Sequence, residues 1–257
     1  MIQIKHEYLK SIDSTNNEIK RRAIKGAEEG QVISAGMQTA GRGRSGHQWE
    51  TPADISIATS LLLRPTMPVE QLHSLTLVAA VAVRRAIEGL YDIETWIKWP
   101  NDVIVHGKKI CGILTEMSAA NGQAEYVVVG IGVNVHQTSF SEELADKAIS
   151  VDMALQEQNP GTQEKGNCEE LTQRIWQEFV LLYEAFCMTQ DLSIVMEEYN
   201  RFLINRNAMV RVLDPQGEWE GIARGINEHG ELLVETKEDL RQVDSGEVSV
   251  RGVYGYV

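Results

Sequence analysis

The segment from residue 95 to 135 constrains the fold most, because four strand-like runs follow one another there with only short turns between them. The runs cover 96–99, 103–106, 110–117 and 126–135, and Gly107-Lys108 and Asn121-Gly122 are turn signals between them. Short turns join antiparallel neighbours, whereas a parallel pair needs a crossover of about a dozen residues or more. We therefore predict antiparallel hairpins in this segment and exclude βαβ units from it.

Helical patterns lie on both sides of this segment. Thr15 and Glu18 have the spacing of a capping box and predict a helix start, with Gly26 or Gly30 ending the helix. Apolar residues recur at helical spacing from Val69 to Tyr91 and predict a core helix behind the sheet. The expected helices are 16–29, 69–91, 141–147, 150–156, 168–189 and one ending near Asn205. Together these patterns predict an α+β fold with a mixed, largely antiparallel sheet backed by helices.

The C-terminal fifty or so residues have a different pattern. Short β runs there are broken by turn residues at 215–217, 229–230 and 245–246, which is typical of a small SH3-like β-barrel. A chain of 257 residues can bury one large core and one small one. We therefore predict two domains, 1–205 and 206–257, with the boundary near Arg206.

Charge and cysteine content limit the classes of function. The formal net charge is −13, which gives no electrostatic reason to bind nucleic acid or an anionic membrane. Three cysteines without a CxxC pair, together with the lack of a cationic leader, indicate reduced thiols in a cytoplasmic protein. No run of residues approaches the roughly 18 apolar residues of a membrane span. We expect neither nucleic acid nor membrane among the partners.

Residues 41–46, Gly-Arg-Gly-Arg-Ser-Gly, match the G-x-G-x-x-G pattern of dinucleotide-binding proteins. That pattern should open a helix and have an acidic residue about 20 positions later, but His47-Gln-Trp-Glu-Thr-Pro52 follows and no acidic residue occupies the expected region. The remaining interpretations are a surface turn with solvated arginines, or a loop in which guanidinium groups close over carboxylate or phosphate oxygens. The alternation of arginine and glycine favours the second.

Five motifs, in this order along the chain, resemble those of biotin protein ligases. They are Asp13-Ser-Thr-Asn16, Gln38-Thr-Ala-Gly-Arg-Gly-Arg-Ser-Gly-His-Gln-Trp49, Lys98-Trp-Pro-Asn-Asp102, Lys108-Lys-Ile-Cys-Gly-Ile-Leu114 and Gly130-Ile-Gly-Val-Asn134. The resemblance extends into the C-terminal segment. It implies the catalytic fold that this family shares with class II synthetases. It also implies a stand-alone ligase that forms biotinyl-5′-AMP from biotin and ATP, with Mg²⁺, and transfers biotin to a lysine of a biotin carboxyl carrier protein.

The resemblance also implies a role for individual residues. Catalysis is expected from Lys109, Arg42 and Arg44. Contacts to biotin are expected from Ser14, Thr15, Asn16, Gln38, Gly41, Arg42, Arg44, Lys109, Gly112, Leu114, Gly130 and Gly132. Contacts to ATP are expected from Arg44, Trp49, Lys98, Asn101, Asp102, Lys109 and Asn134. Oxygen atoms suit the hard cation Mg²⁺, so Asp102 and Asn134 are its expected ligands.

Each of these residues also has a simpler interpretation. Thr15 can cap the first helix, leaving Ser14 nearer the ligand, and the Lys98 motif can be a proline turn with its lysine in solvent. Lys109 can be an ordinary hairpin charge, and Trp49 can fill core. The glycines of 112–114 and 130–134 can mark bulges in core strands. The resemblance favours the site for Lys98, Lys109 and Trp49. For the two glycine motifs, core strand and ligand wall are compatible, and for Thr15 we favour the helix cap.

Three alternatives for the whole chain have different consequences. A lipoate or octanoate ligase of the same superfamily would accept another acid. A biotin-responsive repressor would need a helix-turn-helix domain, for which the start of the Asp13 motif leaves no room, so operator binding is expected to be absent. An adaptor built on the C-terminal barrel would not need Lys109. A homodimer is compatible with all of them. Two departures from the family pattern are His47, where arginine is common, and Asn207, where glycine is common.

Overall fold

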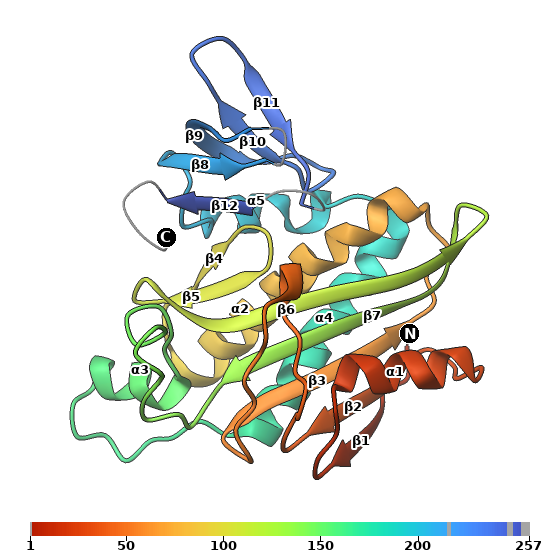
Figure 1. Ribbon diagram of the computed structural model, residues 1–257, viewed down its shortest axis with the longest axis vertical. Coiled ribbons are helices and arrows are strands. Elements are labelled where there is room, and N and C mark those ends of the chain that lie inside the picture. The colour runs from red at the N-terminus through yellow and green to blue at the C-terminus, as the bar shows by residue number, and fades with distance from the viewer. Residues whose placement is uncertain (1, 215–216, 246–248, 253–257) are drawn as a thin grey trace.

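The computed structural model describes residues 2–214, 217–245 and 249–252, and its largest element is a seven-stranded mixed sheet (Figure 1). The strand order is β1-β2-β3-β7-β6-β5-β4. The strands are β1 (Lys5–Leu9), β2 (Gln31–Ala35), β3 (Ser56–Leu63), β4 (Trp96–Lys98), β5 (Asp102–Val105), β6 (Lys108–Ala120) and β7 (Gln123–Asn134). Within this sheet, β1 and β2 pair in parallel and the other neighbours pair antiparallel.

The predicted hairpins between residues 95 and 135 are confirmed. Strands β4, β5, β6 and β7 follow one another in antiparallel pairs. His106 and Gly107 make the first tight turn with φ values of 49° and 76°, and Asn121 and Gly122 make the second with φ values of 53° and 76°. Positive φ at both central positions is what a two-residue turn of the primed type requires. Residues of types that tolerate positive φ therefore fix the register of the central strands.

Helices cover the two faces of the sheet unequally (Figure 1). Helix α1 (Thr15–Ile24) packs on one face over a small cluster that includes Ile19, Leu62 and Val128. Helices α2 (Leu75–Tyr91) and α4 (Cys168–Thr189) pack on the other face over the main core. Because α1 is short, it covers only part of its face and leaves the rest open for a site.

Four further helical elements complete the larger body. The 3₁₀ turns η1 (Arg44–Gly46) and η2 (Val69–Ser74) lie in the connections beside β3, and α3 (Val151–Gln158) follows β7. Helix α5 (Ser193–Arg201) leads to the C-terminal part of the chain. Within the part of the chain that the structure describes, no helix has both the length and the apolar composition that crossing a bilayer requires.

The C-terminal strands form a second sheet of SH3-like size, as predicted. Its order is β11-β10-β9-β8-β12, all antiparallel. The strands are β8 (Met209–Leu213), β9 (Trp219–Ile226), β10 (Leu232–Glu235), β11 (Leu240–Val243) and β12 (Ser249–Gly252). The turn before β10 docks on the larger body, because Trp99 Nε1 donates a 3.0 Å hydrogen bond to the Gly230 carbonyl.

Several helix predictions differ from the structure. The first helix ends at Ile24, because Lys25 and Gly26 leave the helical conformation. Its N-cap residue is Ser14 and makes no side-chain capping bond, so the prediction that Thr15 caps the helix is wrong. Residues 141–147 form turns instead of a helix, and the segment from 69 to 74 is a 3₁₀ turn ahead of α2. The helix 168–189 is confirmed at both ends.

Candidate active site

A cavity lies on the face of the sheet that α1 leaves partly open. Its walls come from the N-terminal end of α1, the loop between β2 and β3, and the centres of β3, β6 and β7. The residues around it are Ser14, Thr15, Asn16, Gln38, Arg42, Gly43, Arg44, Trp49, Ala58, Asn101, Lys109, Gly112, Ile113, Leu114, Gly130, Ile131 and Gly132. Segments far apart in the sequence therefore converge on one place.

Glycines form the floor of the cavity because other atoms lie directly against the strands. A Cβ atom at Gly130 would stand 2.0 Å from Oδ1 of Asn16, and one at Gly132 would stand 2.4 Å from the Trp49 ring. A Cβ at Gly112 would stand 2.9 Å from the same ring. Side chains at these three positions would displace Asn16 and Trp49. Glycine is therefore needed there, because it lets these two side chains lie directly against the strands.

Trp49 covers this floor from the loop. Its indole lies over Gly112 and Gly132, and Lys109 Nζ lies 5.5 Å from the ring centroid. The indole Nε1 is buried without a hydrogen-bond partner, which is costly for a donor. A flat aromatic surface with an unsatisfied donor at a cavity wall is suited to contact with a polar, partly planar ligand.

Charged groups converge beside the Trp49 ring. Lys109 Nζ lies 2.6 Å from Oδ1 of Asp102, an ion pair across β5 and β6. Lys98 is 7% exposed, and burial lowers its pKa to about 8 against the opposing effect of Asp102. Burial likewise lowers the pKa of Arg44, which Asp102 and Asp244 partly offset. Three cations, Lys98, Lys109 and Arg44, thus lie near the two carboxylates of Asp102 and Asp244, so the group has a net positive charge that suits an anionic ligand.

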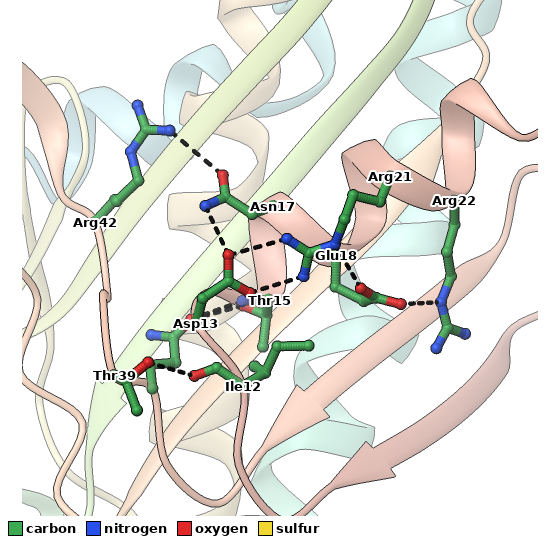
Figure 2. A network of polar contacts seen from close by, with 10 residues as sticks. Ile12, Asp13, Thr15, Asn17, Glu18, Arg21, Arg22, Thr39 and Arg42 are labelled. Atoms are coloured by element: carbon green, nitrogen blue, oxygen red, sulfur yellow. Dashed lines mark hydrogen bonds and ion pairs between the residues drawn. The ribbon is translucent and has the colours of Figure 1, made fainter.

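The two loop arginines reach different parts of the protein. Arg42 extends back to α1, where its Nη1 lies 3.4 Å from Oδ1 of Asn17, which in turn donates to Asp13 (Figure 2). Its Nη2 lies 3.4 Å from Oε1 of Glu116. Arg44 donates to the backbone carbonyl of Ser245, in the turn that follows β11. The loop is therefore held by long, weak contacts at Arg42 and by a turn of the C-terminal domain at Arg44.

A chain of hydrogen bonds runs beneath the cavity and ties the loop to α1. Gln38 accepts from the Thr15 backbone N–H at 2.8 Å and donates to Thr51 at 3.0 Å, so it joins the two ends of the loop. Ser60 on β3 donates to Oδ1 of Asn16 at 2.6 Å, and its hydroxyl lies 2.7 Å from that of Thr15. This bonding explains why Thr15 does not cap its own helix.

Most of the predicted site residues come together. Thirteen of them line the cavity: Ser14, Thr15, Asn16, Gln38, Arg42, Arg44, Trp49, Asn101, Lys109, Gly112, Leu114, Gly130 and Gly132. Asp102 contacts Lys109 from outside the lining, and Lys98 lies close enough to both for their charges to influence its pKa. Gly41 is buried against the Trp49 backbone. Their individual roles stay predictions.

Asn134 is placed differently from the others. Its side chain is buried, donates to the Ile149 carbonyl at 3.2 Å and accepts from Gln137 at 3.1 Å. Among the described residues, no cluster of three or more His, Cys, Asp or Glu side chains could hold a metal ion. The predicted Mg²⁺ ligands Asp102 and Asn134 are thus not part of a preformed protein cage.

Two polar residues of this region, Ser60 and Glu116, were not predicted from the sequence. Ser60 is fully buried on β3, and Glu116 is a largely buried carboxylate on β6 that contacts Asn16 and Arg42. Both follow a cavity residue by two positions, Ala58 and Leu114 respectively, so strand alternation places them on the same face. The two-residue spacing from Ala58 and Leu114 could have identified both residues from the sequence.

Comparison with known proteins gives consistent matches along the chain. Residues 8–134 match the model of the Biotin/lipoate A/B protein ligase family, and residues 207–251 match the Biotin protein ligase C terminal domain. The bifunctional ligase/repressor BirA of Bacillus subtilis is 35% identical over 249 residues, which cover 96% of this chain and 73% of the relative. The biotin--[acetyl-CoA-carboxylase] ligase of Mycobacterium tuberculosis is 33% identical over 244 residues, covering 91% and 85%.

Solved structures agree with this relationship. The biotin protein ligase of Aquifex aeolicus in complex with biotin and ATP superposes with a TM-score of 0.81 at 28% identity, covering 96% of this chain and 99% of that one. The match thus includes the larger body and the C-terminal sheet. From the two family models, the extent of the identity and the shared fold, it follows that the chain belongs to the biotin/lipoate A/B protein ligase family, and within it to the biotin protein ligases.

Proposed function

We propose that the chain is an ATP-dependent biotin protein ligase, which joins biotin to a lysine of a biotin carboxyl carrier protein. The observation that carries the proposal is the cavity itself, where Arg42, Arg44 and Lys109 converge on a glycine floor. Fixed positive charge next to an apolar, glycine-lined slot is what an acid needs when it is activated by a nucleotide. Family membership supplies the identity of the acid.

The reaction has two steps. The biotin carboxylate attacks the α-phosphorus of ATP, which forms a carboxyl–phosphate bond, releases pyrophosphate and leaves biotinyl-5′-AMP. The amine of the acceptor lysine then attacks the acyl carbon, loses a proton, and expels AMP as the amide forms. Neither step needs a covalent bond to the enzyme. Catalysis comes from orienting the reactants and stabilising the charge that develops on the phosphate.

Lys109 and the loop arginines have complementary tasks in this scheme. Lys109 is fixed by Asp102 at 2.6 Å, so its ammonium is already oriented toward the transition-state phosphate oxygens when the substrates bind. Arg42 and Arg44 come from the loop between β2 and β3 and close over the mixed anhydride. Closure excludes water, which would otherwise hydrolyse the anhydride.

Magnesium would enter with the nucleotide. Mg²⁺ is usually bound by one or two carboxylates together with substrate phosphates instead of a protein cage, and the carboxylate of Asp102 beside Lys109 fits that description. When bound, the ion would neutralise phosphate charge. The engaged amide of Asn134 is better suited to supporting the strand end than to direct ligation.

Three coarser expectations stay predictions. The boundary near Arg206 is supported by the start of the second family match at residue 207. A cytoplasmic location is supported by the cysteine content. Homodimer formation is compatible with the sequence and has no further support.

Pyrophosphate exchange tests the proposed function. The purified chain should incorporate labelled pyrophosphate into ATP when biotin is present, and should not do so with lipoate or octanoate. The hydrogen-bonding groups beneath the cavity, including Thr15, Asn16 and Ser60, match a cyclic urea and would stay unsatisfied against an alkyl chain. Exchange supported by lipoate alone would establish the alternative ligase instead.

A further inference from the structure

Glu116 is a charged residue on β6 whose function the reaction scheme leaves open. It lies at the α1 side of the cavity, two residues beyond Leu114, and its side chain is 17% exposed. Oε2 accepts a 2.9 Å hydrogen bond from Nδ2 of Asn16. Oε1 pairs with Lys20 at 2.5 Å and more distantly with Arg42 at 3.4 Å. The Glu116 carboxylate therefore contacts both α1 and the loop between β2 and β3, the two segments that flank the cavity.

The contacts of Asn16 determine which way its amide group faces. Its nitrogen donates to Glu116 and, at 3.3 Å, to the Leu114 carbonyl, so both amide protons are used. Its oxygen accepts from Ser60 at 2.6 Å and lies over Gly130 on the cavity floor. If the amide were flipped, its oxygen would meet the Glu116 and Leu114 oxygens, which are both acceptors. The flipped arrangement is therefore excluded by repulsion as well as by lost bonds.

An amide oxygen has two acceptor positions, and Ser60 occupies only one. We propose that Glu116 is a positioning residue for substrate recognition: by accepting from the Asn16 amide, it keeps the amide oxygen available at the cavity floor to accept an N–H of a cyclic-urea ligand. This inference rests on the proposed function, because it assumes that the biotin ureido ring binds beside Asn16 and Gly130. Glu116 itself does not touch the ligand.

The charge state of Glu116 fits this task. Burial raises the pKa of its carboxyl, but hydrogen bonds from Lys20 and Asn16 outweigh burial and the pKa is lowered. The group is thus an acceptor, and not a donor, throughout the neutral range. Lys20 supplies the compensating charge from α1, which leaves Arg42 only loosely attached and able to move toward the ligand carboxylate.

Two substitutions at Glu116 separate orientation of the amide from charge. Glu116→Gln removes the charge but keeps an oxygen that can accept from Asn16, whereas Glu116→Met removes both. We expect biotin affinity, measured by calorimetric titration, to stay within about threefold of wild type for Glu116→Gln and to fall at least about tenfold for Glu116→Met. Glu7→Met is the matched control. It breaks a 2.7 Å ion pair between Glu7 and Arg22, which is also on α1 but lies away from the cavity.

Biotin analogues methylated on one or the other ureido nitrogen provide a readout that a purely structural role would not change. In the wild type, one of the two analogues should bind at least about tenfold more weakly than biotin, because methylation removes the N–H that Asn16 accepts. In Glu116→Met that analogue and biotin should bind almost equally. In Glu116→Gln the discrimination should persist.

The outcomes are distinguishable. A wild-type protein that binds no biotin would overturn the proposed function and this inference with it. Wild-type binding with unchanged affinity and discrimination in Glu116→Met would overturn the inference alone, as would equal losses in Glu116→Gln and Glu116→Met. If Glu116→Met does not fold, hydrogen exchange of the wild-type Asn16 side-chain amide decides: slow exchange is expected, and exchange as fast as that of the exposed Asn121 would contradict the bond to Glu116.

Discussion

Lys98 shows how a single buried charge can connect stability and activity. Its pKa is lowered to about 8 from an ordinary value of 10.5, mainly by burial. Because the folded pKa lies below the unfolded one, the cost of burying the charge is fully present at neutral pH and is relieved as pH rises above 8. Burial thus makes the Lys98 ammonium costly for the folded protein at neutral pH, and we expect an anionic ligand to reduce that cost.

We predict that the KM for ATP rises above about pH 8 as Lys98 loses its proton. Lys98→Arg keeps its charge to far higher pH, so its KM for ATP should stay flat across this range. Initial rates at several ATP concentrations from pH 7 to about pH 9.5 measure both profiles. Identical alkaline limbs in the two proteins would show that another group titrates.

Gly130 allows a second prediction at the residue scale. A Cβ at this position would stand 2.0 Å from Oδ1 of Asn16, so Gly130→Ala should displace the Asn16 amide and weaken biotin binding at least about tenfold. Gly89→Ala is the control, because the nearest atom to its added Cβ would be 3.9 Å away and alanine favours the helix. Calorimetric titration measures both. Equal biotin affinity in wild type and Gly130→Ala would remove Asn16 from the proposed site.

At the scale of elements, the loop between β2 and β3 has the clearest separate task. Gln38 and Thr51 join its two ends, while Arg44 reaches across to the carbonyl of Ser245 in the turn after β11. If the bond between Arg44 and Ser245 forms and breaks while the base stays fixed, the loop can close over a bound intermediate and open again. Arg44 is therefore expected to affect retention more than chemistry.

Arg44→Gly should release biotinyl-5′-AMP into solution while the first step continues. We expect about tenfold more intermediate in the filtrate than for wild type, quantified by chromatography after rapid ultrafiltration. Glu50→Gln, an exposed substitution in the same loop, is the control and should leave release unchanged. Tight retention in Arg44→Gly would argue against the loop as the closing element.

Elements with local signals were predictable from the sequence. The turn signals Gly107-Lys108 and Asn121-Gly122 predicted the central hairpins, although the first turn lies one residue earlier, at 106–107, and the periodicity of α4 predicted both its ends. Features that depend on tertiary contacts could not be predicted from the sequence. The capping pattern at Thr15 was overridden by its bonds to Gln38 and Ser60, and Glu116 gave no motif because its function depends on Asn16, which is distant in sequence.

At the scale of the whole molecule, the C-terminal sheet is attached beside the motif for which we predict contacts to ATP. Trp99, within the motif that contains Lys98 and Asp102, is 3% exposed and donates to the Gly230 carbonyl at 3.0 Å. Ser74 donates to the neighbouring His229 carbonyl at 3.0 Å. These two bonds and the contact of Arg44 with Ser245 join the C-terminal part of the chain to the larger body.

Trp99→Phe tests this attachment. Phenylalanine keeps most of the packing but leaves the Gly230 carbonyl without its donor, which should lower the free energy of unfolding by ~1–2 kcal/mol. Denaturant titration measures the change, and Trp96→Phe on the half-buried face of β4 serves as the control for loss of an indole. A cost no larger than that of the control would mean that the bond does not hold the two sheets together.

Transfer of biotin to an acceptor tests the central claim most directly. The purified chain, biotin, Mg²⁺ and ATP are incubated with a biotin carboxyl carrier domain, and intact-mass spectrometry follows the acceptor. We predict the addition of a single biotinyl group to one lysine, and a rate at least about a hundredfold lower with Lys109→Ala, whose folding is checked by its melting temperature. An unmodified acceptor with the wild type, or equal rates with Lys109→Ala, would contradict the account.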